Sequence, residues 1–245
     1  MARTGLPSYN LPVRTLLPPA PIEAVLFDFH STLVDPGDAG TWLELGWARL
    51  GRPATAAKVL GEARFAALAG WLDRIWEHAA LVDPHTERDR SPARHREVYD
   101  AVTARAPELD LERDLSAALY EVMLDTWVPY EDTLPVLQAL RARGLKLGLI
   151  SNVGCDVRGV LDRGGMTPLL DTVVLSFEAG AVKPQAAIFQ RALAALGVPP
   201  ERALMVGDSA RDDVGAAFLG SPTLILPRTA GRVHGLDAVL RLVGG

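Results

Sequence analysis

Short apolar runs of strand character alternate with helical stretches through the second half of the chain. The strand candidates are 146–150, 172–175, 203–206 and 224–226, with an earlier one at 23–29. The helical candidates are 132–143, 155–163, 184–196, 211–219 and 236–243. Strands that alternate with helices of this length pair in parallel, because each helix carries the chain back across the sheet. The pattern therefore predicts an α/β fold with a parallel sheet.

A long stretch without strand character separates the first apolar run from the others. Its helical candidates are 41–50, 54–80, 91–105 and 112–125, and all five tryptophans lie between positions 42 and 127. We therefore expect a core domain made of residues 22–36 and 129–245, with a helical domain inserted at 37–128. Residues 1–21 contain five prolines and no continuous apolar run, which favours an irregular arm over a signal peptide.

The composition argues against several classes of protein. The chain has 245 residues, a net charge of -5 and a pI of about 5.6, whereas a dedicated nucleic-acid binder is usually basic. No apolar run approaches the roughly 20 residues that a membrane-spanning helix needs. Cys155 is the only cysteine, so no intramolecular disulfide can form, which fits a reducing compartment. We expect a cytoplasmic protein that binds neither nucleic acid nor membranes.

Polar residues end the strand candidates or open the next helix at four places. They are Asp28 to Thr32, Ser151-Asn152, Lys183-Pro184, and Gly207-Asp208-Ser209 with Asp212 and Asp213. Ligands of an open parallel sheet bind outside the carboxyl ends of its strands, so these clusters should converge. Converging carboxylates repel one another and require a cation, and oxygen ligands suit Mg²⁺. A neighbouring lysine and serine could hold phosphate oxygens, so the residues predict metal-assisted phosphoryl transfer.

Taken in order, these motifs resemble those of a known superfamily. The set DFHST, SN, KP and GDSxxDD, which covers about residues 22–226, is similar to that of the haloacid dehalogenase-like (HAD) hydrolases. The helical insertion after the first motif is similar to the C1 cap of HAD phosphatases. The resemblance implies a Rossmann-like parallel-sheet core with an inserted C1 cap. It also implies a Mg²⁺-dependent phosphatase or phosphotransferase that acts on a small phosphorylated metabolite.

The resemblance also implies a role for each motif residue. Asp28 would be the nucleophile that forms an aspartyl phosphate. Lys183 would neutralise the transferring phosphoryl group, which would also be bound by Thr32, Ser151 and Asn152. The implied Mg²⁺ ligands are Asp28, the backbone carbonyl of His30, Asp208, and Asp213 with Asp212 as the alternate.

His30 departs from the pattern of the superfamily's phosphatases, which have aspartate two residues after the nucleophile. Histidine titrates near pH 6.5 and is a competent general acid and base, so we expect His30 to serve this role. Substrate positioning and a neutral replacement are the alternatives. Loss of the aspartate also leaves open a 2-haloacid dehalogenase, a phosphonate hydrolase, or a HAD-like binding protein without turnover. The intact Gly207-Asp208-Ser209 motif argues against a dehalogenase, because displacing halide needs no metal.

Two further groups of residues could line the cleft. The tryptophans should mostly pack between helices, but Trp42 and Trp47 follow closely on the catalytic loop and are candidates for substrate contact. The segment 83–90 is dense in charge, and we expect a solvated loop there. The alternative is that Arg88, Arg90 and Arg94 attract an anionic substrate.

Overall fold

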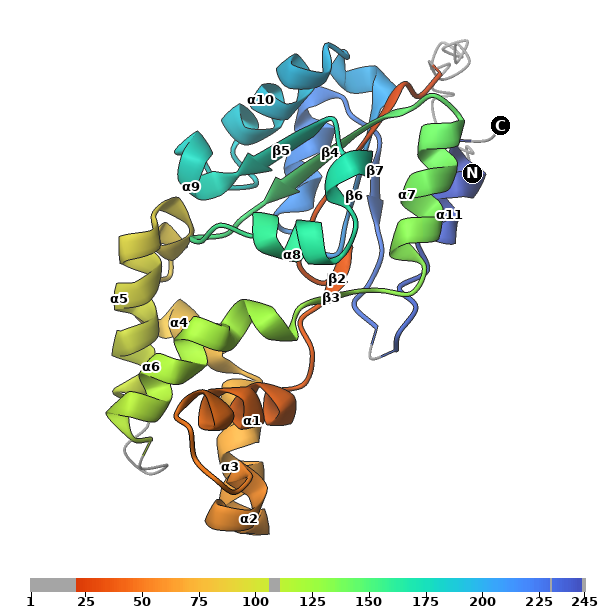
Figure 1. Ribbon diagram of the computed structural model, residues 1–245. Helices are drawn as coiled ribbons and strands as arrows, with labels where there is room; N and C mark the ends of the chain where they lie inside the picture. The colour runs from red at the N-terminus through yellow and green to blue at the C-terminus, as the bar shows by residue number, and fades with distance from the viewer. Residues whose placement is uncertain (1–20, 106–110, 230, 244–245) are drawn as a thin grey trace, which may run out of the picture.

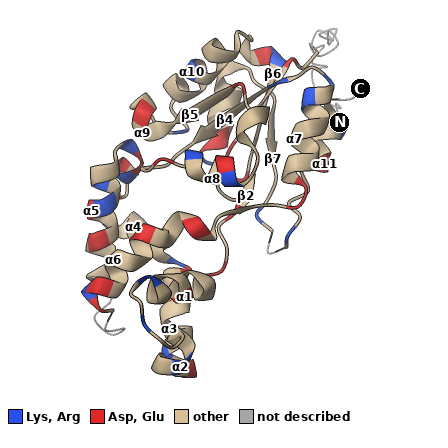
Figure 2. Ribbon diagram, in the orientation of Figure 1, with Lys and Arg blue, Asp and Glu red and all other residues tan. Residues whose placement is uncertain are grey.

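The computed structural model describes residues 21–105, 111–229 and 231–243. The irregular arm expected at 1–21 therefore lies, except for Pro21, outside the described residues. None of the described helices is long and apolar enough to cross a membrane. Acidic and basic residues are mixed along both α5 (Pro92–Thr103) and α6 (Arg113–Val122), so neither helix presents a basic stripe (Figure 2).

Five parallel strands form the central sheet, in the order β5-β4-β1-β6-β7 (Figure 1). The strands are β1 (Ala24–Phe27), β4 (Lys146–Ser151), β5 (Thr172–Leu175), β6 (Ala203–Gly207) and β7 (Thr223–Ile225). The first strand in the sequence is the central one, since Ala24 is in register with Lys146 on one side and with Ala203 on the other. The expected α/β fold with a parallel sheet is confirmed.

Helices cover both faces of this sheet because its central strand is apolar on both. Ala24 and Leu26 face α10 (Ala186–Leu196), whereas Val25 and Phe27 face the side of α7 (Thr133–Ala142) and α11 (Asp237–Leu242). All four side chains are fully buried, and burial of a large apolar side chain contributes about 1.5–3 kcal/mol. The other described helices of the core are α8 (Arg158–Arg163), the short α9 (Ser176–Ala179) and the 3₁₀ helices η4 (Thr167–Leu169), η5 (Pro200–Arg202) and η6 (Asp213–Leu219).

Some boundaries differ from those that the sequence predicts. The helix expected from Pro184 begins at Ala186, because Gln185 has extended backbone angles. Asp132, a candidate cap of α7, makes no capping bond there. Its carboxylate instead accepts the backbone N–H groups of His234, Gly235 and Leu236 and so holds the C-terminal segment against the start of α7.

The chain leaves the core and returns to it along a short antiparallel pair. In this pair β2 (Val34–Asp35) lies beside β3 (Val128–Pro129). The intervening residues 36–127 are called the helical insertion below. Its helices are α1 (Ala39–Arg49), α2 (Ala56–Leu60), α3 (Glu62–Leu72), α4 (Ile75–Val82), η1 (Glu87–Arg90), α5, α6 and η3 (Met123–Thr126).

The helical insertion has an apolar cluster of its own, which includes Leu43, Tyr99 and Leu119. The single helix expected at 54–80 is three helices. Gly61, with φ of +76°, separates α2 from α3, and Arg74 leaves the helical region before α4. Glycine adopts a positive φ without the penalty of a Cβ, so the chain turns at this point.

Candidate active site

A cleft of about 450 Å³ lies between the carboxyl ends of the strands and the helical insertion. The core contributes polar residues to its lining, among them Asp28, Lys183 and Asp208. The helical insertion contributes aromatic and charged residues, among them Trp76 and Arg88. The four motifs therefore meet, as expected, at the carboxyl ends of the strands, where the cleft is open to a ligand.

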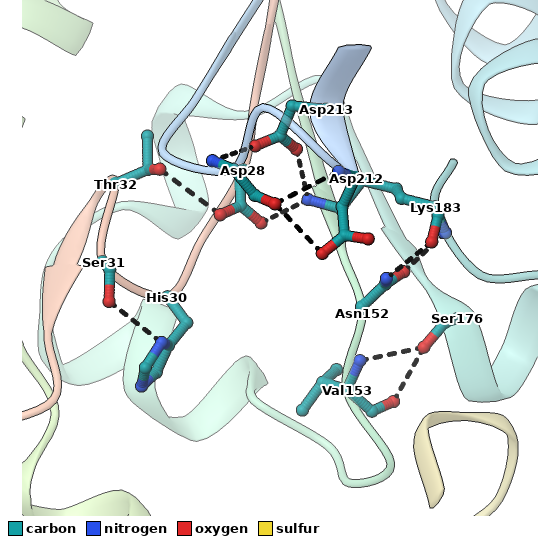
Figure 3. A network of polar contacts seen from close by, with 11 residues as sticks. Asp28, His30, Ser31, Thr32, Asn152, Val153, Ser176, Lys183, Asp212 and Asp213 are labelled. Carbon is teal, nitrogen blue, oxygen red and sulfur yellow. Dashed lines mark hydrogen bonds and ion pairs between the residues drawn. The ribbon is translucent and has the colours of Figure 1, made fainter. Parts of the chain in front are cut away.

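Asp28 is the first residue beyond β1, and its loop is held by bonds within the core. Its backbone N–H donates to the Val206 carbonyl at 2.8 Å, which continues the pairing of β1 with β6. Its carboxylate accepts a hydrogen bond from Thr32 Oγ1 at 3.3 Å (Figure 3). Ser31 takes a positive φ of 64° to close the turn. Thr32 therefore braces Asp28 from within the loop, and the carboxylate is 7% exposed, toward the cleft.

Lys183 joins two of the motifs by its side chain. Its Nζ lies 2.5 Å from Asp28 Oδ1 and 2.7 Å from Asp213 Oδ1, and the residue is only 3% exposed (Figure 3). Burial opposes the ammonium charge, but the two carboxylates outweigh burial and raise the pKa of Lys183. The lysine is therefore a permanent cation beside Asp28.

A third carboxylate, that of Asp208, lies beside the two that contact this ammonium. Ligand oxygens of Asp28, Asp208 and Asp213 lie within 4.8 Å of one another. Among the described residues, this cluster has the size and composition of a metal-binding site. Burial, together with the charges of Asp28 and Asp213, raises the pKa of Asp208 to about 7. Burial and Asp28 also raise the pKa of Asp213, against the effect of Lys183. The charge of Asp28 thus disfavours the ionised forms of Asp208 and Asp213, and a further cation would relieve this repulsion.

Asp213 and its neighbour Asp212 have different partners. The Asp213 side chain is fully buried, and its second oxygen accepts the backbone N–H of Ser209 at 3.0 Å. It packs so closely on Gly207 that a Cβ there would lie 2.0 Å from Asp213 Oδ2. Asp212 is half-buried and instead accepts Ser209 Oγ at 3.1 Å. Of the two aspartates, the structure brings Asp213 together with Asp28 and Asp208.

Ser151 and Asn152 both line the cleft at the end of β4, but in different ways. Asn152 Nδ2 donates to the Lys183 carbonyl at 3.0 Å, and its Oδ1 accepts the Lys183 N–H at 2.7 Å. Its amide is thus used to position the Lys183 backbone. The Ser151 side chain is buried at 2% exposure in the cleft wall, where its hydroxyl can meet a ligand.

The side chain of His30 lies in the same cleft. Its Nδ1 is 3.1 Å from Ser31 Oγ, and its ring meets Trp127 edge-on at a centroid distance of 4.7 Å. Burial and the charge of Arg228 lower the pKa of His30 to about 4, against the effect of Asp35. The imidazole is therefore neutral at pH 7 in this environment.

This geometry can be compared with known proteins. Residues 22–219 match the haloacid dehalogenase-like hydrolase family. The chain belongs to this family. It is 31% identical over 209 residues to the glyceraldehyde 3-phosphate phosphatase of Methanothermobacter thermautotrophicus, covering 84% of this chain and 85% of that one. It is 32% identical over 111 residues to the (S)-2-haloacid dehalogenase of Pseudomonas putida, covering 45% of this chain and 49% of that one. The HAD phosphatase of Thermococcus onnurineus superposes with a TM-score of 0.61 at 26% identity, covering 91% of this chain and 99% of that one.

The tryptophans of this HAD-like hydrolase do not all lie where the sequence predicts. Trp42 lines the cleft, with Nε1 donating to the Leu119 carbonyl. Trp47 does not line it: the indole is buried within the insertion, and Nε1 donates to the Ala54 carbonyl. Trp47 therefore lies outside the cleft, whereas the sequence predicts that it contacts substrate. Trp76 and Trp127 line the cleft instead, and nothing in their immediate sequence distinguishes them.

The charge-dense segment 83–90 is not a solvated loop. Asp83 and Asp89 are buried, and the Arg88 side chain is only 15% exposed. Arg88 and Asp89 line the cleft. For Arg88 this position is the alternative to a solvated loop, and for Asp89 the sequence does not predict it. Arg228, in the chain beyond β7, also lines the cleft, with Nε 3.9 Å from Asp208 Oδ2, and no motif in the sequence indicates it.

Proposed function

We propose that this HAD-like hydrolase is a Mg²⁺-dependent phosphatase or phosphotransferase that acts on a small phosphorylated metabolite. The observation that carries the proposal is the contact of Lys183 Nζ with both Asp28 and Asp213, with Asp208 beside them. This arrangement pairs a nucleophile with a cation that can balance phosphoryl oxygens. The phosphatase names of two of the similar proteins support the same activity.

The chemistry of the carboxylate cluster fits Mg²⁺. The three carboxylates form an oxygen donor set of the kind that Mg²⁺ prefers. Two of them, Asp208 and Asp213, have raised pKa values, so a cation beside them would be stabilised. We assign the metal to Asp28, Asp208, Asp213 and the backbone carbonyl of His30. When bound, Mg²⁺ would balance negative charge on the phosphoryl oxygens and on the nucleophile.

In the first step, an Asp28 oxygen attacks phosphorus and the bond between phosphorus and the ester oxygen breaks. The leaving oxygen takes a proton and departs as an alcohol, and the phosphoryl group remains on Asp28. Lys183 and the Ser151 hydroxyl face the phosphoryl oxygens, whose charge they stabilise without needing to reorganise. Thr32 keeps the Asp28 carboxylate in place through its 3.3 Å hydrogen bond.

In the second step, water attacks phosphorus, inorganic phosphate leaves, and the Asp28 carboxylate is restored. We assign both proton transfers to His30, because its ring lies in the cleft two residues from the nucleophile and is held by Ser31 and Trp127. The neutral imidazole can accept a proton from the attacking water. To donate one to the leaving oxygen, His30 must first be protonated, a state that the negative charge of the bound substrate phosphate would favour.

We further propose that residues 37–128 form a C1 cap domain over a core made of 22–36 and 129–245. The cleft has the core on one side and the helical insertion on the other. The β2–β3 pair is where the chain passes between them. A cap placed in this way would exclude bulk water from the reacting phosphoryl group and contact the leaving group.

The test is hydrolysis of p-nitrophenyl phosphate and of a panel of phosphorylated metabolites, with Mg²⁺ and with EDTA. The wild type should turn over in Mg²⁺, and Asp28→Asn should lose at least about a thousandfold in kcat, since it removes the nucleophile. Asp125→Asn, an exposed aspartate outside the cleft, is the matched control and should keep its activity.

Other results would point to the alternatives. Full Mg²⁺-dependent activity in Asp28→Asn would refute the mechanism. Metal-independent halide release from a 2-haloacid would favour a dehalogenase. Cleavage of a carbon–phosphorus bond would favour a phosphonate hydrolase. Binding of Mg²⁺ and of a phosphate analogue without any turnover would favour a binding protein.

A further inference from the structure

Arg88 lines the cleft, and one nitrogen of its guanidinium has no hydrogen-bond partner among the described residues. Its Nη1 is buried and donates a hydrogen bond to none of the described residues. The closest carboxylate oxygens are Asp83 Oδ2, 3.9 Å from Nη1, and Asp89 Oδ1, 3.7 Å from Nε. Both distances exceed a hydrogen bond. A buried donor without an acceptor costs roughly 1–3 kcal/mol, more when it is charged, so Arg88 is suited to an acceptor that a ligand brings.

Neighbouring residues fix the direction of this side chain. Its guanidinium carbon lies 5.5 Å from the centroid of the Trp76 ring, a cation–π distance. Asp83 accepts the backbone N–H groups of Glu87 and Arg88 at 3.2 and 2.8 Å, which shapes the turn that carries Arg88. The guanidinium is therefore already oriented before any ligand binds.

The segment that carries Arg88 is also fixed to the core, beside the catalytic residues. Ser176 Oγ, on α9, donates to the Asp89 carbonyl at 2.5 Å, and Arg90 donates to the Gly180 carbonyl at 3.1 Å. Gly154 lies so close to this segment that a Cβ would stand 2.2 Å from the Arg88 carbonyl oxygen. Since Gly154 follows Ser151 and Asn152 by only a few residues, Arg88 enters the cleft next to the end of β4.

The charges that line the cleft single out Arg88. Lys183 is hydrogen-bonded to two carboxylates, and the Arg228 side chain is 60% exposed. The Arg88 side chain is only 15% exposed, and its two carboxylate neighbours lie beyond hydrogen-bond distance. Arg88 is the one lysine or arginine that the described part of the helical insertion contributes to the cleft lining. The other charged groups there are acidic: Asp38, Asp73, Glu77 and Asp89.

We propose that Arg88 is a specificity-determining residue that binds a second anionic group, a carboxylate or a phosphate, on the leaving group of the substrate. The proposal rests on the proposed function, which places the reacting phosphoryl group at Asp28 and Lys183. The leaving group then extends toward the helical insertion. There the planar guanidinium of Arg88 can donate two parallel hydrogen bonds to two oxygens of a carboxylate or phosphate. Asp38, Asp73 and Glu77 would repel an anion elsewhere on this wall, whereas at Arg88 the guanidinium opposes the charge of Asp89.

Matched substrates test this directly. 3-Phosphoglycerate is compared with glycerol 3-phosphate for a carboxylate, and propane-1,3-diol bisphosphate with 3-hydroxypropyl phosphate for a second phosphate. The measured quantity is the ratio of kcat/KM for the anionic and neutral members of each pair, which does not depend on the fraction of folded enzyme. The variants are Arg88→Gln, Arg88→Lys and the control Arg94→Gln, whose exposed arginine also lies 3.9 Å from Asp83 but outside the cleft lining.

The wild type should prefer the anionic member of at least one pair, and the pair preferred identifies the group. In Arg88→Gln this ratio should fall about 10- to 100-fold, the range for a lost charged hydrogen bond. Arg88→Lys should retain part of the preference, and Arg94→Gln all of it. An unchanged ratio in Arg88→Gln, or no preference in either pair, would overturn the proposal.

Calorimetric binding of the same four probes separates this proposal from the proposed function. If the wild type hydrolyses neither these probes nor p-nitrophenyl phosphate and the metabolite panel, the phosphatase assignment fails, and the binding preference still decides the role of Arg88. Tighter binding of an anionic member that Arg88→Gln abolishes supports the role. Equal binding of both members overturns it.

Discussion

Replacing Lys183 with methionine removes the buried cation from the carboxylate cluster and keeps most of the side-chain volume. The ammonium lies 2.5 Å from Asp28 and 2.7 Å from Asp213, and the lysine is 3% exposed. Removing one partner of a buried ion pair costs about 3–5 kcal/mol, because it leaves uncompensated charge inside the protein. We expect the free energy of unfolding at pH 7, in EDTA, to fall by this amount in Lys183→Met.

A second substitution tests whether charge is the cause. Asp213→Asn, added to Lys183→Met, removes one of the two carboxylates that the first change leaves unpaired. The asparagine oxygen can still accept the Ser209 N–H that Asp213 accepts now. The double variant should therefore be about 1–3 kcal/mol more stable than Lys183→Met alone, as expected for directly coupled residues.

Urea unfolding followed by circular dichroism at 222 nm measures both effects. Lys58→Met is the matched control, because Lys58 is exposed on α2; such surface changes usually stay within about 0.5 kcal/mol. The reasoning fails if Lys183→Met is no less stable than Lys58→Met. It also fails if adding Asp213→Asn destabilises the protein further.

Two other changes probe the contact between the helical insertion and the core. Gly154→Ala places a Cβ 2.2 Å from the Arg88 carbonyl oxygen, and the displacement should lower the free energy of unfolding by about 1–3 kcal/mol in urea. Asp89→Asn should raise the free energy of unfolding by about 1–3 kcal/mol at pH 7 and hardly change it at pH 4. Burial raises the pKa of Asp89 to about 6, above the unfolded value of about 3.9, so the carboxylate costs stability only as pH rises through that window.

Each of these two predictions has its own contrary outcome. Gly159→Ala is the control for Gly154, since its nearest neighbour would be Arg163 at 3.6 Å on a helix. Equal stability of the two alanine variants would contradict the close contact. For Asp89, a gain in stability that is the same at pH 4 and pH 7 would show that burial of the charge is not its source.

The core of the fold could be predicted from the sequence because its strands are buried on both faces. Such strands appear as short apolar runs with a polar residue at the carboxyl end, as in Ala24–Phe27 followed by Asp28. Helix boundaries inside 54–80 could not be predicted in this way, because the apolar pattern continues across the turn at Gly61. The four-residue α9 is too short to show any period.

The side of the cleft that carries the four motifs could be predicted for a similar reason, since each motif directly follows a strand or opens a helix. The opposite side could not, because it depends on how the helical insertion packs on the core. Trp42 and Trp47 show the difference: five positions on a helix are separated by roughly 140° around its axis, so the two indoles of α1 face different surroundings. The position of Arg88 depends on contacts such as the one from Ser176 to Asp89, which no local pattern encodes.

The central position of β1 has a consequence for how the protein folds. The strand is made early in synthesis, but its neighbours β4 and β6 follow only after the whole helical insertion, and the Asp28–Lys183 contact spans 155 residues. Contacts so distant in sequence form slowly, and unpaired strand edges favour aggregation in the meantime. The insertion, whose cluster joins residues closer in sequence, can gain its helices first. Recovery of enzymatic activity should therefore follow recovery of helix content, because the catalytic pair is among the last contacts to close.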